Sequence, residues 1–293
     1  MTYENINNTY KMGWIPDKPD FRDYTTEHPA INPILKKMGI LGSTPTILPT
    51  KVDLRQWCGP IYDQGDLGSC TANAGAGAIE YFERKAFGNY INPSRLFLYK
   101  TTRNLMQVTG DTGAEIRNML GALVMLGVPP EKYWPYDTAK YDEEPLAMCY
   151  ALAEDYKAIQ YARLDSSNIT TGTLLNSIKT HLAAGIPSIF GFTVYSSYTQ
   201  AGQSGKIPFP SRNENTVGGH AVRAVGYDDN MVITNNNDNS PTTGALIIPN
   251  SWGTTWGDKG YGYLPYQYVL QGLALDWWIL LSTTWMNSGN FGF

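Results

Sequence analysis

The chain has 293 residues, of which 42% are hydrophobic and 16% are charged, and its formal net charge is −4. This length is sufficient for a large buried core, either in one domain or in two lobes of one unit. The mildly acidic balance gives no electrostatic reason to expect a nucleic-acid partner. No stretch approaches the roughly 18 consecutive apolar residues of a membrane span, so a membrane partner is not expected either.

The start of the chain and its cysteines bear on the cellular compartment. The first ten residues are polar and rich in Asn, and they lack the apolar stretch of a secretory signal. Three cysteines are too few for a disulfide scaffold, although a single bridge between Cys58 and Cys149 stays open at this stage. We therefore expect an intracellular protein, and we expect it to be a monomer.

Residues 1–47 are predicted to form an N-terminal extension. Two prolines, Pro16 and Pro19, interrupt any helix over residues 13–24, which therefore read as extended chain, and a short helix is predicted over 32–39. Trp14 and two further aromatic residues of this stretch, Phe21 and Tyr24, need an apolar partner. Two interpretations remain open: a strap on the surface, or a pro-segment that covers the functional cleft.

The catalytic part is predicted to span 48–293, beginning with a helical lobe over about 60–135. Helices are predicted over the three ranges 70–87, 93–103 and 114–126, the second with Asn92 as N-cap and Pro93 at its first position. Two glycines inside the first helix, Gly75 and Gly77, each cost helix stability, which indicates that a neighbouring group approaches closely there.

The second half, over about 150–285, is predicted to be rich in β-structure. One helix is predicted over 173–184, the Asp- and Asn-rich stretch 228–243 is predicted to be a loop, and strands are predicted over 157–163, 186–195, 220–227, 245–249 and 260–264. A helical lobe followed by a β-rich lobe is an α+β arrangement with a cleft between the lobes.

Cys70 is the candidate nucleophile. It follows a glycine-punctuated loop and opens the predicted helix, where unpaired backbone N–H groups and the helix dipole stabilise a thiolate. Gln64 lies six residues upstream, close enough to place a side-chain amide beside the sulfur.

His220 is the candidate base among three histidines. His28 and His181 are interpreted as surface residues, whereas His220 follows two glycines and opens a predicted strand. The orienting group is predicted to be Asn250, because an amide oxygen or nitrogen can fix one imidazole nitrogen, and the tryptophans that follow it can keep water away. Taken singly, each of these patterns also fits an ordinary core histidine or a turn.

Together, these stretches resemble the papain-like cysteine peptidases, and the likeness extends from about Leu48 to Tyr268. It rests on four ordered elements, namely Gln64-Gly65, Gly68-Ser69-Cys70, the Gly-Gly-His-Ala-Val stretch at 218–222, and Asn250-Ser251-Trp252-Gly253 with Trp256-Gly257. His220 follows Cys70 by 150 residues, as is usual in the family. Asn250 follows by 180, which is longer than usual, and stretch 228–243 accounts for the surplus.

The resemblance implies a two-lobe fold with a helical lobe and a β-barrel-like lobe, and a cysteine endopeptidase that works through a thioester acyl-enzyme. It implies Cys70 as nucleophile, His220 as base and acid, Asn250 as orienter and Gln64 as oxyanion donor. The implied substrate-binding and supporting residues are Gly68, Ser69, Gly113 in the stretch Asp111-Thr112-Gly113-Ala114, Gly219, Trp256 on the primed side, and Trp252 as a shield over the His–Asn pair. No metal or organic cofactor is implied, and the partner is a peptide or protein substrate.

The sequence also departs from the family pattern. Leu67 stands where a cysteine is common, and Thr71 stands where an aromatic residue is common. A Gly-Trp-x-Pro-Asp stretch at 13–17 resembles bacterial members. We expect residues 1–47 to cover part of the cleft, because their aromatic residues need an apolar partner, and self-inhibition in a zymogen is one interpretation of that cover. Two other functions stay open: a catalytically silent peptide-binding module, and a transferase or ligase that uses the same acyl-thiol intermediate.

Overall fold

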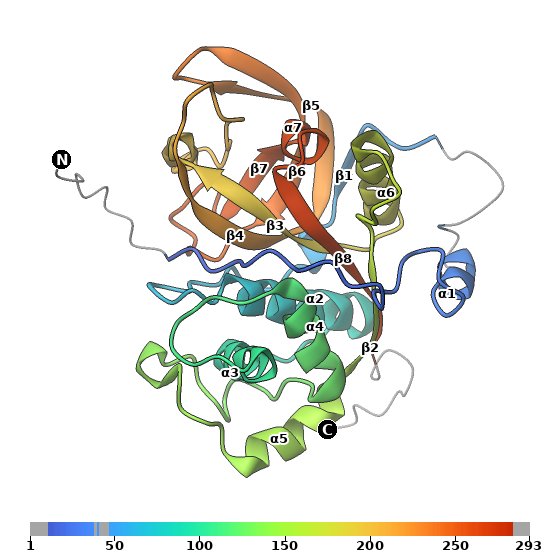
Figure 1. Ribbon diagram of the computed structural model, residues 1–293, viewed down its shortest axis with the longest axis vertical. Helices are drawn as coiled ribbons and strands as arrows, with labels where there is room; N and C mark the ends of the chain where they lie inside the picture. Colours follow the sequence, from blue (N-terminus) through green and yellow to red (C-terminus); the bar gives the residue numbers. More distant parts are fainter. Residues whose placement is uncertain (1–10, 38–39, 41–46, 284–293) are drawn as a thin grey trace.

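The protein is described by a computed structural model, which covers residues 11–37, 40 and 47–283 (Figure 1). Its α-helices are α1 (Asn32–Lys37), α2 (Cys70–Phe87), α3 (Arg95–Met106), α4 (Ile116–Met125), α5 (Ala147–Ala153), α6 (Thr171–Ala183) and α7 (Tyr266–Leu270). Its strands are β1 (Lys51–Asp53), β2 (Ala158–Arg163), β3 (Ser188–Tyr195), β4 (Thr216–Ala224), β5 (Gly226–Asn235), β6 (Ser240–Pro249), β7 (Tyr261–Pro265) and β8 (Ala274–Thr283).

Helix α2 is the central element of the helical lobe. Its residues from Cys70 to Glu83 are all buried, because α3 and α4 pack on one side of it and β4 on the other. The two glycines inside it permit these contacts: a Cβ at Gly75 would lie 2.3 Å from the sulfur of Met119, and one at Gly77 would lie 2.3 Å from the guanidinium of Arg223. The close approach predicted from these glycines is therefore confirmed.

The β-rich lobe consists of two antiparallel four-stranded sheets, with strand orders β1-β5-β6-β7 and β2-β8-β3-β4. The mixed α+β class predicted from the sequence is confirmed. The lobe is not a closed barrel, because each sheet of the described residues ends in two terminal strands that do not pair with each other, β1 and β7 in one sheet and β2 and β4 in the other.

The two lobes lie on opposite sides of an extended stretch of chain. In Figure 1 the N-terminal segment, drawn in dark blue, runs between α2, α3 and α4 on one side and β3, β4 and β8 on the other. This segment continues into α1, and the chain then returns through β1, which pairs with β5. The N-terminal extension therefore passes through the junction of the lobes.

Several predicted boundaries were wrong. The second helix begins at Arg95, because Pro93 pairs with Pro130 and the Ser94 side chain caps the helix by accepting the Phe97 N–H. The third begins at Ile116, because the residue at 114 instead forms a bridge with Trp14. The end of the predicted helix 32–39 lies outside the described residues.

One larger stretch was assigned wrongly, and one strand was missed. Stretch 228–243 is not a loop: β5 and β6 pair through it as a hairpin whose turn spans 236–239. Strand β8, which pairs with both β2 and β3, was not predicted.

His181 is buried on α6 rather than exposed, with Nδ1 bonded to the Ser177 carbonyl, whereas His28 stacks on Tyr24 near the surface. Cys58 and Cys149 are both free thiols. Among the described helices, none is long and apolar enough to cross a membrane.

Candidate active site

The four predicted catalytic residues meet where the lobes join. Cys70 begins α2, and the backbone N–H of Ala221, the neighbour of His220 on β4, donates to its Sγ at 3.4 Å. The His220 Nε2 lies 2.8 Å from the Asn250 Oδ1, just after the end of β6. Elements that are far apart in the chain thus bring a thiol, an imidazole and an amide together, as a nucleophile, a base and an orienting group require.

Gln64 is held beside Cys70 by three hydrogen bonds of its side chain. Its Oε1 accepts from the Ser251 hydroxyl at 2.5 Å, and its Nε2 donates to the carbonyls of Leu67 at 2.8 Å and Lys11 at 2.9 Å. The Gln64 N–H also donates to the Ser251 carbonyl at 2.8 Å. The dipeptide Asn250-Ser251 therefore orients both the imidazole and the amide.

Aromatic rings enclose His220. Trp252 stacks on the imidazole with ring centroids 4.7 Å apart, and Phe192 meets its edge at 5.9 Å. Trp256, half-buried, packs edge-on against Trp252 at 5.3 Å. Burial lowers the pKa of His220 to about 4. The hydrogen bond to Asn250 favours the charged ring and acts in the opposite direction, but its effect is smaller. At neutral pH the imidazole is neutral in this state, and its Nδ1 makes no hydrogen bond to any described group.

The Cys70 thiol is also neutral in this state, which corrects the expectation of a stabilised thiolate. Burial raises the pKa of the Cys70 thiol to about 11, outweighing the backbone N–H groups of Ala221, Gly13, Thr71 and Cys70 itself, which act in the opposite direction. Two of these N–H groups belong to the start of α2, so the helix contributes as predicted, but its effect is smaller than the cost of removing water.

The N-terminal segment is what excludes the water. Residues 11–15 cross the cleft directly above Cys70 and pair with both walls. On the helical wall the Ala114 N–H donates to the Gly13 carbonyl at 2.8 Å, and the Ile15 N–H donates to the Ala114 carbonyl at 3.0 Å. On the β wall the Trp14 N–H donates to the Gly219 carbonyl at 2.9 Å. The segment thus forms a strand-like bridge between the lobes.

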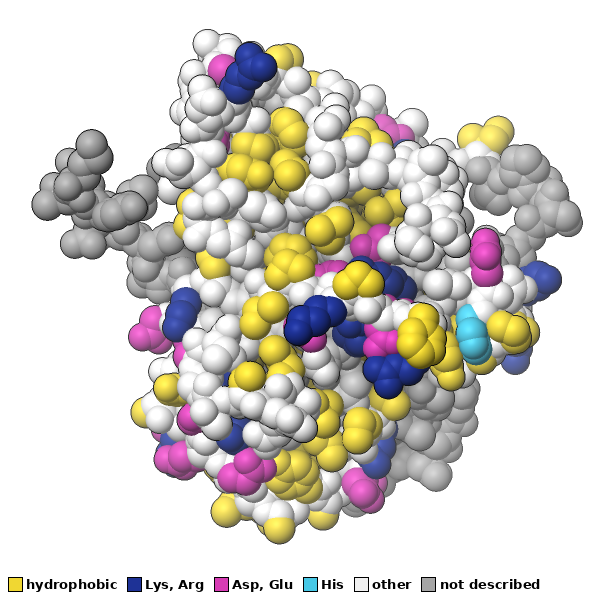
Figure 2. Space-filling model, viewed as in Figure 1, with side chains coloured by type: hydrophobic (Ala, Val, Ile, Leu, Met, Phe, Trp, Pro, Cys, Tyr) yellow, Lys and Arg dark blue, Asp and Glu magenta, His cyan; other side chains and the backbone are white. Residues whose placement is uncertain are grey.

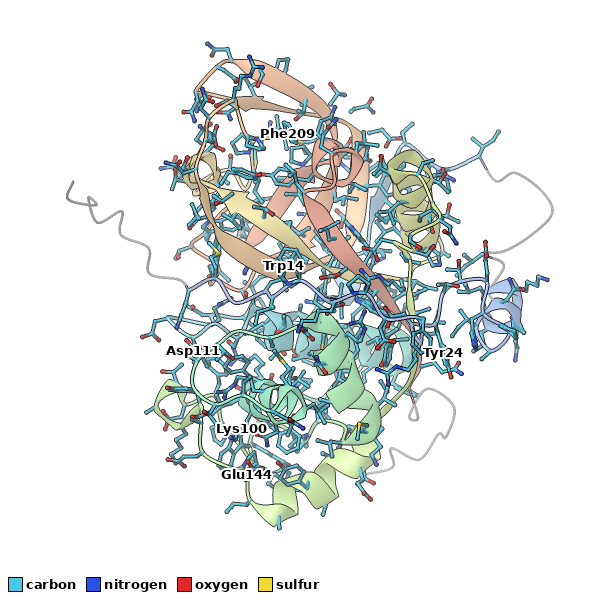
Figure 3. All side chains as sticks on the ribbon, viewed as in Figure 1. Trp14, Tyr24, Lys100, Asp111, Glu144 and Phe209 are labelled. Atoms are coloured by element: carbon cyan, nitrogen blue, oxygen red, sulfur yellow. The ribbon has the colours of Figure 1, made fainter. Side chains whose placement is uncertain are left out.

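Trp14 anchors this crossing (Figure 3). Its indole lies against β3 and β4, where a Cβ at Gly191 would be 1.9 Å and one at Gly219 would be 2.8 Å from the ring. Its Nε1 donates to Asp276 Oδ2 on β8 at 3.2 Å, and its side chain is buried. The apolar partner that the sequence required for Trp14 is therefore a pocket of the β-rich lobe. This pocket has room for the indole because Gly191 and Gly219 carry no side chain.

A network of carboxylates and guanidinium groups fixes the segment beyond Trp14. Asp23 receives two bonds from the Arg117 guanidinium at 2.6 and 2.7 Å, and Arg163 contacts the same carboxylate at 3.4 Å. Asp17 accepts from the Trp278 Nε1 at 2.9 Å. Burial, together with the adjacent Asp276, raises the pKa of Asp17 to about 7. Two surface hollows, of about 440 and 720 Å³, flank this part of the segment rather than Cys70, because the cleft itself is filled.

Apart from Trp256, which packs on Trp252, the predicted substrate-binding residues fall into two groups. Gly68, Gly113 and Gly219 contact the segment and therefore line the cleft. Ser69 points away from it: its hydroxyl is paired with the Tyr136 hydroxyl at 2.6 Å and accepts from the Asn73 amide at 3.0 Å. Its side chain therefore supports the loop before α2.

The roles of three further residues at this site were not predicted from the sequence, although Ser251 and Asp111 lie in stretches that were named there. Ser251 stands in the motif that carries Asn250, and its hydroxyl fixes Gln64. Asp111 binds both the loop before α2 and the segment, and Asp276 receives Trp14. No local pattern reveals these contacts, because Gly68 and Lys11 lie more than forty residues from Asp111, and Trp14 lies still farther from Asp276. Within the described ranges no cluster of three or more His, Cys, Asp or Glu side chains is arranged to hold a metal ion.

The same architecture occurs in known proteins. Residues 48–270 match the family described as papain family cysteine protease. An uncharacterized peptidase C1-like protein of Acanthamoeba polyphaga mimivirus is 37% identical over 287 residues, which is 93% of this chain and 87% of that protein. Peptidase 1 of Euroglyphus maynei is 29% identical over 219 residues, and the match covers 74% of this chain and 60% of that protein.

Among solved structures, xylellain, a cysteine protease from Xylella fastidiosa, superposes with a TM-score of 0.71 at 35% identity. That match covers 92% of this chain and 95% of the solved chain, so it extends into the residues before 48. The fold, the buried Cys70 and His220 at the lobe junction and these likenesses agree with one another.

Proposed function

The chain belongs to the papain family of cysteine proteases and is a cysteine-type peptidase, and from that premise we propose that it is an endopeptidase acting through a thioester on Cys70. The observation that carries the proposal is the placement of four groups at the lobe junction: the Cys70 thiol beside β4, the His220–Asn250 bond, and the Gln64 amide bound to a peptide carbonyl. We further propose that residues 48–293 are the catalytic domain.

In the proposed reaction, His220 Nδ1 takes the thiol proton as Cys70 Sγ attacks the scissile carbonyl carbon. The Gln64 Nε2 and the Cys70 N–H donate to the carbonyl oxygen as it becomes negative. The imidazolium then gives its proton to the departing amine, and a thioester remains on Cys70. Water, deprotonated by His220, hydrolyses the thioester and restores the thiol. Support for the oxyanion role of Gln64 is that its Nε2 already binds the Lys11 carbonyl at 2.9 Å.

We also propose that the enzyme is made as a zymogen in which residues 1–47 are inhibitory. The support is that residues 11–15 fill the cleft, that Cys70 and His220 are buried beneath them, and that both groups are neutral there. The segment pairs with Ala114 in the parallel sense. The Gly13 N–H faces Cys70 Sγ, which supports a mode of binding in which the segment occupies the cleft without being cleaved.

The test uses full-length protein and a library of fluorogenic peptides. Substituting Trp14→Ala opens the cleft, and in that background we expect peptide hydrolysis that falls by at least about a thousandfold in Cys70→Ala or His220→Ala. Circular dichroism and melting temperature check that these variants stay folded. Near-normal cleavage by either folded variant would refute the proposed nucleophile or base. Product analysis with a competing amine separates hydrolysis from acyl transfer, which would yield amide products.

A further inference from the structure

The hydroxyl group of Tyr136 joins the two ends of the loop that separates Gln64 from Cys70. Tyr136 lies in the connection between α4 and α5, and its hydroxyl donates to the Gln64 backbone carbonyl at 3.0 Å. The same hydroxyl is paired with the Ser69 hydroxyl at 2.6 Å. One side chain of the helical lobe therefore contacts both the residue proposed as oxyanion donor and the residue directly before the nucleophile.

Each hydrogen bond of this bridge has a defined direction. The Gln64 carbonyl can only accept, so the Tyr136 hydroxyl uses its proton there and accepts from Ser69. The Ser69 hydroxyl in turn accepts at 3.0 Å from the amide of Asn73, which lies in the first turn of α2. Burial raises the pKa of Tyr136 to about 12, so its hydroxyl remains a donor at neutral pH. Three hydrogen bonds thus run in one direction from α2 to Gln64.

Arg95, at the start of α3, holds the Tyr136 ring in place. Its guanidinium carbon lies 3.9 Å from the centroid of that ring, and the guanidinium is fixed by two bonds to Glu131, each of 3.0 Å. Its Nη1 also donates to the Asp63 carbonyl at 3.2 Å and to the Asn73 Oδ1 at 3.3 Å. The ring, the loop before α2 and the first bond of the bridge therefore share one buried support.

Gln64 is held from both lobes, and Tyr136 binds it directly from the helical side. From the β-rich lobe, the Ser251 hydroxyl donates to the Gln64 side chain at 2.5 Å and the Ser251 carbonyl accepts the Gln64 N–H at 2.8 Å. Among the described residues, the other donor to the Gln64 carbonyl is the Leu67 N–H, at 3.4 Å. Without the phenol hydroxyl, the position of Gln64 relative to Cys70 therefore depends mainly on the β-rich lobe.

We propose that Tyr136 is a positioning residue for the oxyanion hole, and that its hydroxyl sets where the Gln64 amide stands relative to the Cys70 N–H. This role rests on the proposed endopeptidase function. Its physical basis is that two donors stabilise a developing oxyanion best when both are fixed before the reaction, because no reorganisation is then needed. A buried hydrogen-bond network in which every member is paired supplies that rigidity.

The experiment compares kcat and KM for a fluorogenic peptide in full-length protein that carries Trp14→Ala to open the cleft. Adding Tyr136→Phe removes the hydroxyl and keeps the ring on Arg95. We expect kcat to fall by about thirtyfold with KM changed by less than about twofold, because the oxyanion develops only in the transition state. This loss is smaller than the factor of about a hundred or more that follows outright removal of an oxyanion donor.

The matched control is Tyr150→Phe. The Tyr150 hydroxyl binds Glu144, which Figure 3 shows at the opposite end of the helical lobe from Trp14. This substitution removes the same group from the same lobe, and kcat should stay unchanged.

Two further measurements separate positioning from a general structural effect. Alkylation of Cys70 by iodoacetamide forms no oxyanion, so its rate should change by less than about twofold when Tyr136→Phe is added. In protein that also carries Gln64→Ala, Tyr136→Phe should change kcat by less than about twofold, because the group that it positions is absent. A full thirtyfold loss in that background, or an equal fall in the alkylation rate, would overturn the positioning role.

Circular dichroism and melting temperature check that the variants are folded. If Tyr136→Phe does not fold, Ser69→Ala breaks the same bridge at its other end and should lower kcat by about threefold or more. An unchanged kcat in the folded variant overturns the positioning role and leaves the endopeptidase assignment intact. Absence of hydrolysis by the Trp14→Ala parent, with Cys70 open to alkylation, overturns the endopeptidase assignment and the positioning role with it.

Discussion

The two ends of the segment that crosses the cleft are held in different ways. Near Cys70 it is held by backbone hydrogen bonds and by one ion pair, Lys11 with Asp111, whose lysine is half exposed. From Trp14 onward it is held by a buried indole and by ion pairs such as Asp23 with Arg117, whose side chains are 11% and 16% exposed. Figure 2 shows acidic and basic side chains gathered on this face of the molecule.

The residues that cover the thiol therefore differ from the residues that anchor the segment. Buried aromatic contacts and well-fixed, partly buried ion pairs contribute more than exposed ones. The residues that cover the thiol are therefore kept in place mainly by residues that do not touch it. Because the thiol is fully buried, the rate at which iodoacetamide alkylates Cys70 reports the fraction of molecules in which the segment has lifted. Each prediction below is measured by that rate in full-length protein.

The largest effect is expected from Trp14→Ala, which empties the glycine-lined pocket and removes the bond to Asp276. Truncation of a buried aromatic costs about 3 kcal/mol, so alkylation of Cys70 should accelerate by about a hundredfold. Phe21→Ala is the control, since that ring belongs to the same segment and is 99% exposed. Equal rates in the two variants would show that the pocket does not anchor the segment.

The next largest effect is expected from Asp23→Ala, which leaves the guanidinium groups of Arg117 and Arg163 without a shared carboxylate. Breaking a partly buried pair costs about 2 kcal/mol, so alkylation should accelerate by about thirtyfold. Among the described residues Asp20 forms an ion pair with Arg22 alone, on an exposed turn, so Asp20→Ala should leave the rate unchanged. An unchanged rate in Asp23→Ala would place the anchoring elsewhere.

A moderate effect is expected from pH, acting through Asp17. Its pKa rises from 3.8 to about 7 when the segment is docked, so docking takes up a proton. The stabilisation is fully present below about pH 4 and is lost as the pH rises through 7, so the cleft should open at neutral rather than acidic pH. The alkylation rate relative to Asp17→Asn should rise by about tenfold between about pH 6 and about pH 8. A ratio that is constant with pH would exclude Asp17 from this role.

The smallest effect is expected from Lys11→Met. The pair with Asp111 involves a half-exposed ammonium, and such pairs contribute at most about 1 kcal/mol. Alkylation should therefore accelerate by only about threefold, and high salt should abolish the difference. The exposed Lys18 of the same segment provides the control substitution. An effect as large as that of Trp14→Ala would mean that the end near the thiol is the true anchor.

Local sequence chemistry was enough to predict α2. Its start at Cys70 and its end at Phe87, followed by Gly88 in the left-handed region at φ +73°, depend on residues within a few positions of each boundary. The start of α3 was missed, because the pairing of Pro93 with Pro130 displaced the predicted Asn92 cap to Ser94. Strand β8 was missed because its place between β2 and β3 depends on partners far away in the chain.

The sequence by itself determined the family resemblance, the α+β class and the candidate set Cys70, His220, Asn250 and Gln64, because these follow from residue types in a fixed order. Only the tertiary structure decided that Trp14 fills a pocket of the opposite lobe and that Asp111 meets Lys11. It also decided the state of the thiol: the helix start favours a thiolate, but burial beneath the segment raises the pKa of Cys70 to about 11. Desolvation depends on what covers a group, and no property of the neighbouring residues in the chain encodes it.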